Sequence, residues 1–355
     1  MSLPPRKLID MPIPILEKIL DDLTLVDLLR FRICSKFFKA VVDGAKPSYE
    51  KIGINSDKTG FTLTIVENGV EHCIKYNWVR AGRRSRCEVI VEKKVLGPAN
   101  VYGPRQQIAS PIRTQLKNGS AVDIFKTDVT FLFCNFKQIT IDKLLLERDV
   151  CFNYQNYMIK FDTMANRNGQ KLSVKELSMT GQINPKDVEN VLSTLLPGFL
   201  HRMHFFMASG SQFHVADICQ TQQWLQAKAV QITPSTMLVT YERHLTRFKF
   251  VELHCAKGIR TIQAAIAKAD ELGDQFEFLR LGGFGYGTLE RRYIEENYPS
   301  LCDNPRFRYK QHPHLNSFLR IKVDARWYDV EIRRVQRDDA GNFEVTDNDQ
   351  RYLDM

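Results

Sequence analysis

Residues 8–42 read LIDMPIPILEKILDDLTLVDLLRFRICSKFFKAVV, and this stretch predicts three short helices in succession. The first helix is predicted to start at Pro12 and Pro14. Proline is tolerated at a helix start because the N–H groups of the first turn have no hydrogen-bond partner within the helix. Its apolar residues recur at helical spacing, at Ile15, Leu16, Ile19, Leu20 and Leu23. A second helix is predicted from Thr24, which has an aspartate three residues later as in a capping box, and a third from Ser35.

The three predicted helices are too short to bury all their apolar surface against one another. Chains below about 40 residues rarely build a stable core without disulfides, metal or a partner. Two explanations for the excess apolar surface remain open at this point. Either the rest of the chain covers it, or a partner protein does.

The order of residues in this stretch also resembles the F-box family. That family combines a proline start, a helix ending in I-L-x-x-L, a D-L pair and a third helix that begins like V-S-R-x-F. The matching residues here are Met11-Pro12, Ile19-Leu20-Asp21-Asp22-Leu23, Asp27-Leu28, and Arg32-Ile33-Cys34-Ser35-Lys36 followed by Phe37-Phe38. Met11 replaces the usual leucine, and Cys34-Ser35-Lys36 replaces Val-Ser-Arg; both exchanges keep the chemistry.

The resemblance implies a partner and a role. An F-box docks on the Skp adaptor of an SCF-type ubiquitin ligase, and through it on cullin, while the rest of the chain selects a protein target. The chain itself is then a non-catalytic subunit. We expect an interface with an apolar centre, formed by Pro12, Leu16, Ile19, Leu20, Leu23, Leu28, Phe31 and Cys34.

Length and composition set wider bounds. The chain has 355 residues, 43% of them hydrophobic and 26% charged, which fits a globular protein of two or three domains. We find no apolar run long enough to cross a membrane and no signal peptide, and we therefore expect a protein of the cytoplasm, the nucleus or both. A net charge of +9 permits an acidic partner without requiring one.

Residues 46–119 predict a small antiparallel β region and a linker. Residues 43–56 contain two glycines and a proline, which suggests a linker with a short strand. Alternation of period two begins at Phe61, turns at Asn68-Gly69 and returns as far as Trp78; Asn-Gly between two such runs predicts a hairpin. An arginine-rich loop follows, then another alternating run as far as Lys94. Glycines and prolines in residues 97–119 predict a flexible connection.

Residues 120–337 alternate short apolar runs with helical patterns. Pairs of apolar residues two positions apart predict strands at Leu177/Met179, Met203/Phe205, Val230/Ile232, Val251/Leu253, Leu279/Leu281 and Phe307/Tyr309. Helices are predicted between them over residues 185–195, 216–225, 235–245, 259–272 and 288–297. One strand and one helix every 20 to 29 residues is the period of leucine-rich repeats. The asparagine that normally follows the L-x-L is absent, however, so an ordinary α/β domain of unrelated strand–helix units remains the alternative.

The end of the chain predicts a closing hairpin. Two alternating runs in residues 316–337 flank a turn near residues 324–326, and the acidic residues 338–355 are expected to fray. The predicted fold is therefore mixed, α+β or α/β, with the F-box in residues 1–45. This order resembles the nematode F-box A family, whose C-terminal part is called the FTH domain. The resemblance rests further on Val174-Lys-Glu-Leu177, Asp187-Val-Glu-Asn-Val191 and Phe250-Val251-Glu-Leu253.

The sequence contains no convincing catalytic or metal-binding motif. The glycine-rich residues 282–287 lack the Gly-Lys-Ser/Thr of a phosphate loop, although Phe284 and Tyr286 within them are candidate target-binding residues. Eight dispersed cysteines form no CxxC pair, and the pairs His201/His204 and His312/His314 have no further ligands in sequence. We expect no metal, no cofactor and no active site.

Two other function classes stay open. A basic loop near residues 80–94, with Arg80, Arg83, Arg84 and Arg86 beside aromatic residues, is compatible with nucleic-acid binding, although a small solvated loop explains it more simply. Alternatively the chain is a repeat-type interaction scaffold without a ligase role, whose N-terminal helices merely cap the fold.

Overall fold

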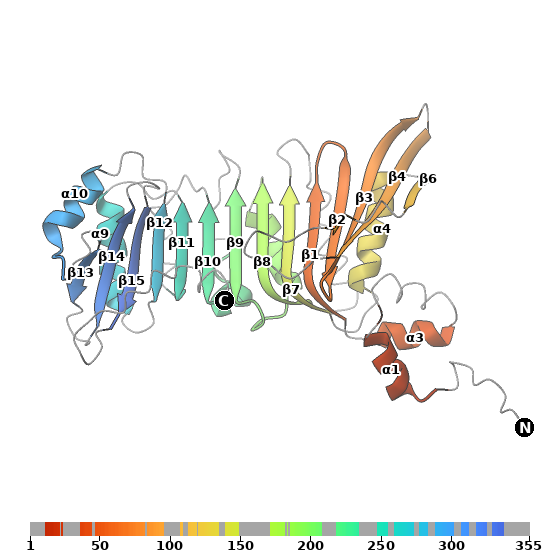
Figure 1. Ribbon diagram of the computed structural model, residues 1–355, viewed down its shortest axis with the longest axis horizontal. Helices are drawn as coiled ribbons and strands as arrows, with labels where there is room; N and C mark the ends of the chain where they lie inside the picture. Colours follow the sequence, from red (N-terminus) through yellow and green to blue (C-terminus); the bar gives the residue numbers. More distant parts are fainter. Residues whose placement is uncertain are drawn as a thin grey trace, which may run out of the picture. The chain divides into compact units, whose positions relative to one another are not determined.

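The chain forms two compact units, one made of residues 1–202 and 220–226, the other of residues 203–219 and 227–355. Figure 1 labels the helices and strands. The computed structural model describes residues 11–21, 23, 36–44, 47–81, 84–95, 107–108, 113–118, 120–134, 139–148, 171–181, 183, 185–207, 218–233, 247–254, 259–272, 277–282, 288–301, 307–311, 317–324 and 329–336. Each unit is described below by itself.

The first unit begins with two short helices. Helix α1 spans Ile13–Asp21 and helix α3 spans Lys36–Gly44, in agreement with the first and third predicted helices. The two helices contact each other. The second predicted helix begins at Thr24, which lies outside the described residues.

A single sheet holds the strands of the first unit. Their order is β8-β7-β1-β2-β3-β4-β5, and β6 also pairs with β4. The pairs β1–β7 and β7–β8 are parallel and the others are antiparallel. The strands are β1 (Ser48–Ser56), β2 (Gly60–Glu67), β3 (Val70–Ala81), β4 (Arg84–Val95), β5 (Gln107–Ile108), β6 (Arg113–Asn118), β7 (Thr140–Arg148) and β8 (Ser173–Gly181).

Two stretches that the sequence predicts as connections contain more strand than expected. Residues 43–56 do not form a linker with a short strand, because β1 is a nine-residue strand whose Ile52 and Ile54 are buried. The expected connection over residues 97–119 contains β6, which pairs with β4 from Arg86↔Asn118 to Val91↔Arg113. Through the β1–β7 pair, the antiparallel β region and the first parallel strands share one sheet.

The hairpin predicted at Asn68-Gly69 is confirmed. Both residues have positive φ, 51° and 70°, as a two-residue type I′ turn requires. The arginine-rich stretch is also a hairpin rather than a loop, since the ladder of β3 and β4 extends to Ala81↔Arg84. Arg80 therefore lies in β3, and Arg84 and Arg86 lie in β4.

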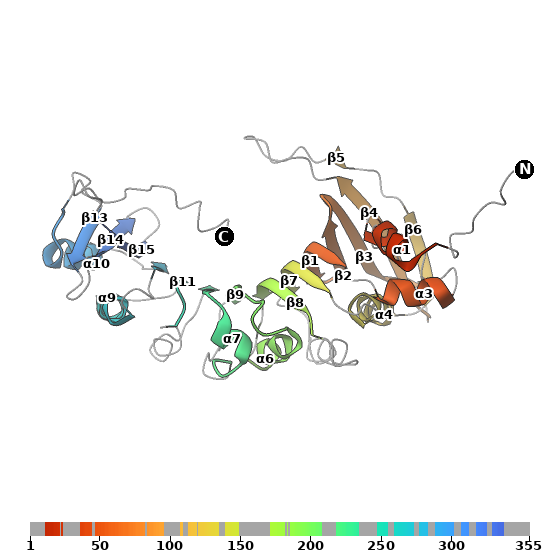
Figure 2. The same ribbon diagram turned by 90° about the horizontal axis from the view of Figure 1, so that it is seen from below.

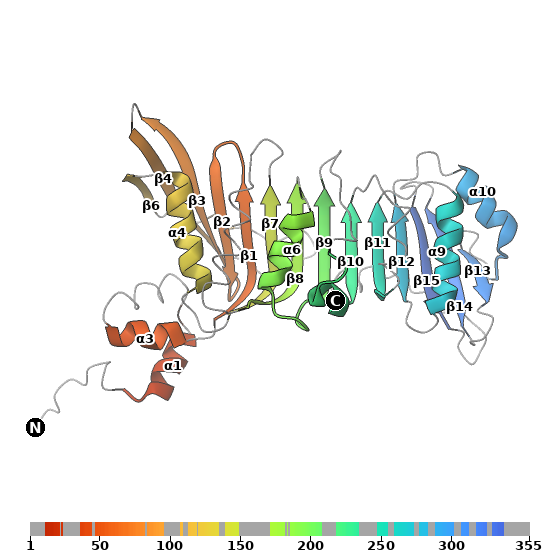
Figure 3. The same cartoon turned by 180° about the vertical axis from the view of Figure 1, so that it is seen from behind.

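Helix α4 (Ala121–Cys134) covers one face of β2, β3 and β4 (Figure 3). The Phe125 ring stacks on Phe61 with centroids 4.6 Å apart and meets the Tyr76 ring edge-on at 5.3 Å. The Tyr76 hydroxyl donates a hydrogen bond of 2.8 Å to Asp128 Oδ2. Burial raises the pKa of this phenol, and the neighbouring carboxylate raises it further, so it stays a neutral donor.

The parallel strands share one burial pattern. In each of β1, β7 and β8, three buried apolar residues lie at relative positions 1, 4 and 6. The residues at positions 2 and 3 both point outward. The triplets are Tyr49, Ile52 and Ile54, then Ile141, Leu144 and Leu146, then Val174, Leu177 and Met179. The outward residues form ion pairs across neighbouring strands. Lys143 Nζ lies 2.5 Å from Glu176 Oε1, and Lys175 Nζ lies 2.7 Å from Asp142 Oδ1.

The second unit contains a sheet in the order β13-β14-β15-β12-β11-β10-β9. The pairs β10–β11 and β11–β12 are parallel, whereas β12–β15, β15–β14 and β14–β13 are antiparallel. The strands are β9 (Arg202–Met207), β10 (Ala229–Thr233), β11 (Phe250–His254), β12 (Phe278–Gly282), β13 (Phe307–Gln311), β14 (Phe318–Asp324) and β15 (Asp329–Val335).

Most predicted helices of the strand–helix region are present. Helices α9 (Ile259–Leu272) and α10 (Thr288–Asn297) have the predicted bounds, and α6 (Pro185–Thr194) ends one residue early. Helix α7 (Gln222–Gln226) is shorter than predicted, and residues 235–245 lie outside the described residues. Figure 2 shows α9 below the strands of its unit, with Ile262, Ile266 and Ala269 buried.

The closing hairpin is confirmed, with one correction to its neighbours. Strands β14 and β15 pair antiparallel, and β15 adds to β12 at the last parallel strand. The Phe307/Tyr309 pair was predicted as a further strand of the strand–helix series; the strand is present as β13, but it pairs antiparallel with β14 at the sheet edge. Among the described helices, none is both long and apolar enough for a bilayer crossing.

Candidate functional site

Helix α1 has two apolar faces, of which only one is covered. Its first turn begins at Pro12, whose carbonyl accepts hydrogen bonds from the N–H groups of Ile15 and Leu16 at 2.9 and 3.2 Å. Leu16 and Leu20, one turn apart, have exposed fractions of 0% and 3%. They form the inward face of α1, as does Val42 for α3.

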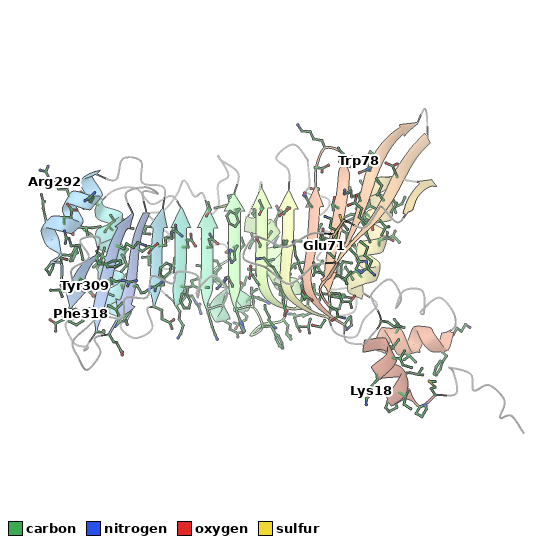
Figure 4. All side chains as sticks on the ribbon, viewed as in Figure 1. Lys18, Glu71, Trp78, Arg292, Tyr309 and Phe318 are labelled. Atoms are coloured by element: carbon green, nitrogen blue, oxygen red, sulfur yellow. The ribbon has the colours of Figure 1, made fainter. Side chains whose placement is uncertain are left out.

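The other apolar face of α1 meets solvent. Ile15 is 48% exposed, which places it among the few large apolar side chains at the surface of the described residues. Pro12 is exposed, and Ile19 and Leu23 are half-buried. Pro12, Ile15 and Ile19 follow one another along α1 at a spacing of three and four, and Leu23 continues this spacing just past the end of the helix. We call these four residues the apolar strip. Figure 4 shows α1 with its exposed Lys18 labelled.

A second candidate surface is the face of the second unit's sheet that lies opposite α9. Register brings Glu252, Arg280, Glu331 and Lys322 into one row across β11, β12, β15 and β14. Arg280 lies 3.5 Å from Glu252 and 4.0 Å from Glu331, and Lys322 lies 3.6 Å from Glu331. Charges that alternate in this way across strands stabilise the sheet and give the face a fixed electrostatic pattern.

Two aromatic residues lie beside this charged row, and a third lies on β9 of the same unit. Phe250 and Phe278 pair across β11 and β12, and both are half-buried. On β9, the Phe206 ring is 37% exposed and stacks with His204 at 6.5 Å. Partly exposed aromatic rings beside fixed charges are common in protein-binding surfaces.

Comparison with known families finds two matching domains, one at the N-terminal helices and one in the strand–helix region. The F-box domain matches residues 8–47, which include α1 and α3, and the FTH domain matches residues 155–279, from before β8 into β12. The chain carries an F-box and an FTH domain. This pair, in this order, is typical of the nematode F-box A family. No curated protein and no solved structure matches the chain.

The structure divides the predicted adaptor-binding residues of the F-box into three groups. Leu16 and Leu20 are buried within the chain, whereas Pro12, Ile19 and Leu23 lie on the exposed or half-buried strip. Leu28, Phe31 and Cys34 lie outside the described residues.

Sequence reasoning missed Ile15 as a contact candidate. Ile15 and Leu16 are adjacent apolar residues at the start of one helix, and periodicity alone does not say which of them faces inward. The only sequence signal for Ile15 was its spacing of three from Pro12 and four from Ile19.

The other candidate sites gain no support from the geometry. Phe284 and Tyr286 lie outside the described residues. His201 is exposed just before β9, and His204 stacks on Phe206; His312 and His314 are not described. Within the described ranges, no three His, Cys, Asp or Glu side chains lie close enough to hold a metal ion.

Proposed function

We propose that this protein is the substrate-recognition subunit of an SCF-type ubiquitin ligase. The observation that carries the proposal is the F-box match over residues 8–47 together with the exposed apolar strip of α1. F-box proteins are in general non-catalytic adaptors that bind Skp. The mechanism is proximity, because holding a target beside the ubiquitin-charged enzyme raises its effective concentration.

The adaptor-binding surface is proposed to centre on Pro12, Ile15, Ile19 and Leu23. Docking would remove the exposed half of Ile15 from water, and large apolar side chains at the centre of an interface contribute most of the binding free energy. Leu16 and Leu20 would act indirectly, by holding α1 against its own domain. Leu28, Phe31 and Cys34 remain proposed contacts from the same domain.

The FTH domain is proposed to hold the target on the face of β11 and β12 that lies opposite α9. The spacing 1, 4, 6 of buried residues in β1, β7 and β8 recurs in the second unit, at Phe248, Val251 and Leu253. This spacing favours a diverged leucine-rich-repeat-like architecture, in which the strand face is a natural binding surface. Phe284 and Tyr286 follow β12 and are proposed to extend that surface. The complex would act in the cytoplasm or the nucleus.

Substitution of Ile15 tests the adaptor surface directly. We expect Ile15→Asp to weaken binding of the full chain to purified Skp adaptor by at least about tenfold, since the interface would bury an unpaired carboxylate. Lys18→Asp is the matched control: it adds the same carboxylate to an exposed position of the same helix and should leave the affinity within about threefold. Dissociation constants from titration calorimetry report both effects.

Leu20→Asp distinguishes residues that contact the adaptor from residues that hold α1 in place. It should abolish adaptor binding and also raise hydrogen exchange throughout α1 and α3, whereas Ile15→Asp should leave exchange in α3 unchanged. Full adaptor affinity of a folded Ile15→Asp chain would show that the exposed strip is not the docking surface. Failure of the intact, folded chain to bind the adaptor would refute the ligase role.

A further inference from the structure

The inference concerns six residues on β1, β2 and β7 of the first unit, which we call the Gly53 patch: Lys51, Gly53, Asn55, Thr62, Thr64 and Glu147. The three strands lie side by side (Figure 1). On β2, Phe61 points toward α4, where its ring stacks on Phe125. Successive side chains of a strand point to opposite faces, so Thr62 and Thr64 lie on the face away from α4. Register across β1, β2 and β7 puts the other four residues on that same face.

Around the patch, the charged residues of this face pair with one another. The ion pairs are Lys75–Glu92 at 2.8 Å, Lys94–Glu71 at 3.4 Å and Lys143–Glu176 at 2.5 Å. Glu50, the acidic neighbour of Lys51 in the sequence, accepts a hydrogen bond of 2.8 Å from the Gly69 N–H. These surrounding groups therefore already have partners within the chain.

The patch itself contains polar side chains without such partners. Its five side chains make neither a hydrogen bond nor an ion pair with any part of the chain that the structure describes. Glu147 is exposed, and the other four are half-buried. Lys51 lies directly opposite Lys143, and like charges in this position destabilise a strand pair. The patch therefore presents one cation, one anion and three neutral hydrogen-bonding groups to a partner.

Gly53 forms the floor of the patch, and nothing in the described chain requires a glycine there. It is not among the glycines with positive φ. A Cβ at this position would have Thr64 Cβ at 3.4 Å as its nearest atom, followed by Leu145 Cβ and Lys51 Cε at 3.9 Å. Both the backbone and the space would therefore accept a side chain. Glycine inside a strand often marks a place where another backbone approaches closely.

We propose that the Gly53 patch binds an extended segment of a partner protein, with the backbone of the segment over Gly53. The segment presents an acidic side chain to Lys51 and a basic side chain to Glu147, while the two threonines and Asn55 hydrogen-bond its backbone. Lys51 and Glu147 are four register steps apart, because Lys51 pairs with Lys143 across β1 and β7. An extended segment advances by the same distance per residue as a strand, so its acidic and basic residues also lie four positions apart.

This contact is separate from the proposed ligase function. No residue of the patch belongs to the apolar strip of α1 or to the target surface on β11 and β12. Adaptor binding should therefore be the same in every variant described below, and a failure of this proposal leaves the proposed function untouched.

A nine-residue peptide, GSESGSKSG, tests the proposal on the full chain. Its glutamate and lysine are four positions apart, whereas the control peptide GSSEKSGSG has the same composition with the two charges adjacent. Titrations are followed by the methyl NMR signals of Thr62, Thr64 and Leu145. We expect saturable shifts with the first peptide, and binding of the control to be weaker by at least about threefold, the size of an exposed ion pair. No saturable shift in the folded chain, or equal affinity for both peptides, overturns the proposal.

Matched variants locate the contact. Lys51→Gln and Glu147→Gln should each weaken binding of the first peptide by at least about threefold. Lys58, an exposed lysine in the turn between β1 and β2, provides the control: Lys58→Gln removes the same charge and should leave binding unchanged. If Lys58→Gln weakens binding as much as Lys51→Gln, general charge attraction holds the peptide and the proposal fails.

Charge reversal gives a result that a merely structural role of Lys51 would not produce. Lys51→Glu should lose the first peptide and bind GSKSGSKSG instead, although the net charge of +9 disfavours a peptide with two lysines. Gly53→Val fills the floor of the patch and should abolish binding without lowering the unfolding midpoint, because valine favours a strand. Failure of the exchange in Lys51→Glu, or full binding by Gly53→Val, contradicts the proposal.

Discussion

Asp57 follows β1 and holds the turn that leads into β2. Its Oδ1 accepts hydrogen bonds from the Thr59 N–H at 2.6 Å, the Thr59 hydroxyl at 2.5 Å and the Gly60 N–H at 3.1 Å. Gly60 has a φ of 155°, and a Cβ there would lie 1.9 Å from the Tyr76 carbonyl oxygen. Asp57 and Gly60 together fix where β2 meets β3.

We predict that Asp57→Ala lowers the free energy of unfolding by about 1 kcal/mol at pH 7. Burial would raise the pKa of Asp57, but the three hydrogen bonds outweigh it and lower that pKa. A carboxyl whose pKa is lowered by folding stabilises above its unfolded pKa of about 3.9, and this stabilisation is lost as pH falls through the folded value. Urea unfolding at several pH values measures the difference between the two chains.

The difference should shrink below about pH 4, whereas Lys58→Ala should change little at any pH. A difference between Asp57→Ala and the parent chain that stays constant down to about pH 2 would contradict the assigned role of the carboxylate.

At the scale of elements, α4 attaches to its sheet through Phe125. The ring is fully buried between Phe61 and Tyr76. We predict that Phe125→Ala destabilises the first unit by about 3–5 kcal/mol, because it removes buried apolar surface and leaves a cavity. Phe206→Ala, at a ring that is 37% exposed, is the control and should cost clearly less. Urea unfolding of both variants measures this, and a loss below about 1 kcal/mol for Phe125→Ala would contradict the packing described.

Sequence reasoning predicts elements well where one local signal dominates. Helix α9 repeats Ile262, Ile266 and Ala269 on one face, and Asn68-Gly69 admits the positive φ angles of its turn. It fails where partners distant in sequence decide. β1 contains Gly53 and polar residues and forms a strand because β2 and β7 pair with both of its edges. Likewise, β13 pairs antiparallel with β14 because the chain turns back between the two strands. The spacing of apolar residues does not predict the direction in which a strand pairs.

The candidate adaptor surface was predictable as a helix but only partly as a set of side chains. The order of residues in the F-box identified α1 and its proline start. Which of Ile15 and Leu16 faces inward depends on how α1 rests on its domain, because both continue the same helical spacing. Burial, rather than sequence, assigns Leu16 and Leu20 to support and Ile15 to the exposed strip.

At the scale of the whole molecule, two family domains occupy different parts of one chain. The F-box match ends at residue 47 and the FTH match begins at residue 155. In the proposed function the first domain fixes the chain to the adaptor and the second holds a target. Residues between the two matches form most of the first unit's sheet, with β1 paired to β7, so the sheet itself begins directly after the F-box.

The most direct test of this account is the mass of the complex formed with Skp adaptor, measured by light scattering during gel filtration. The account predicts a stoichiometric one-to-one complex for the full chain. A chain lacking residues 1–46 should stay folded and elute alone, since none of the described sheet strands lies within those residues. If the full, folded chain elutes apart from the adaptor, the ligase-subunit function is wrong; if the shortened chain unfolds, the N-terminal helices cap the fold, as in a scaffold.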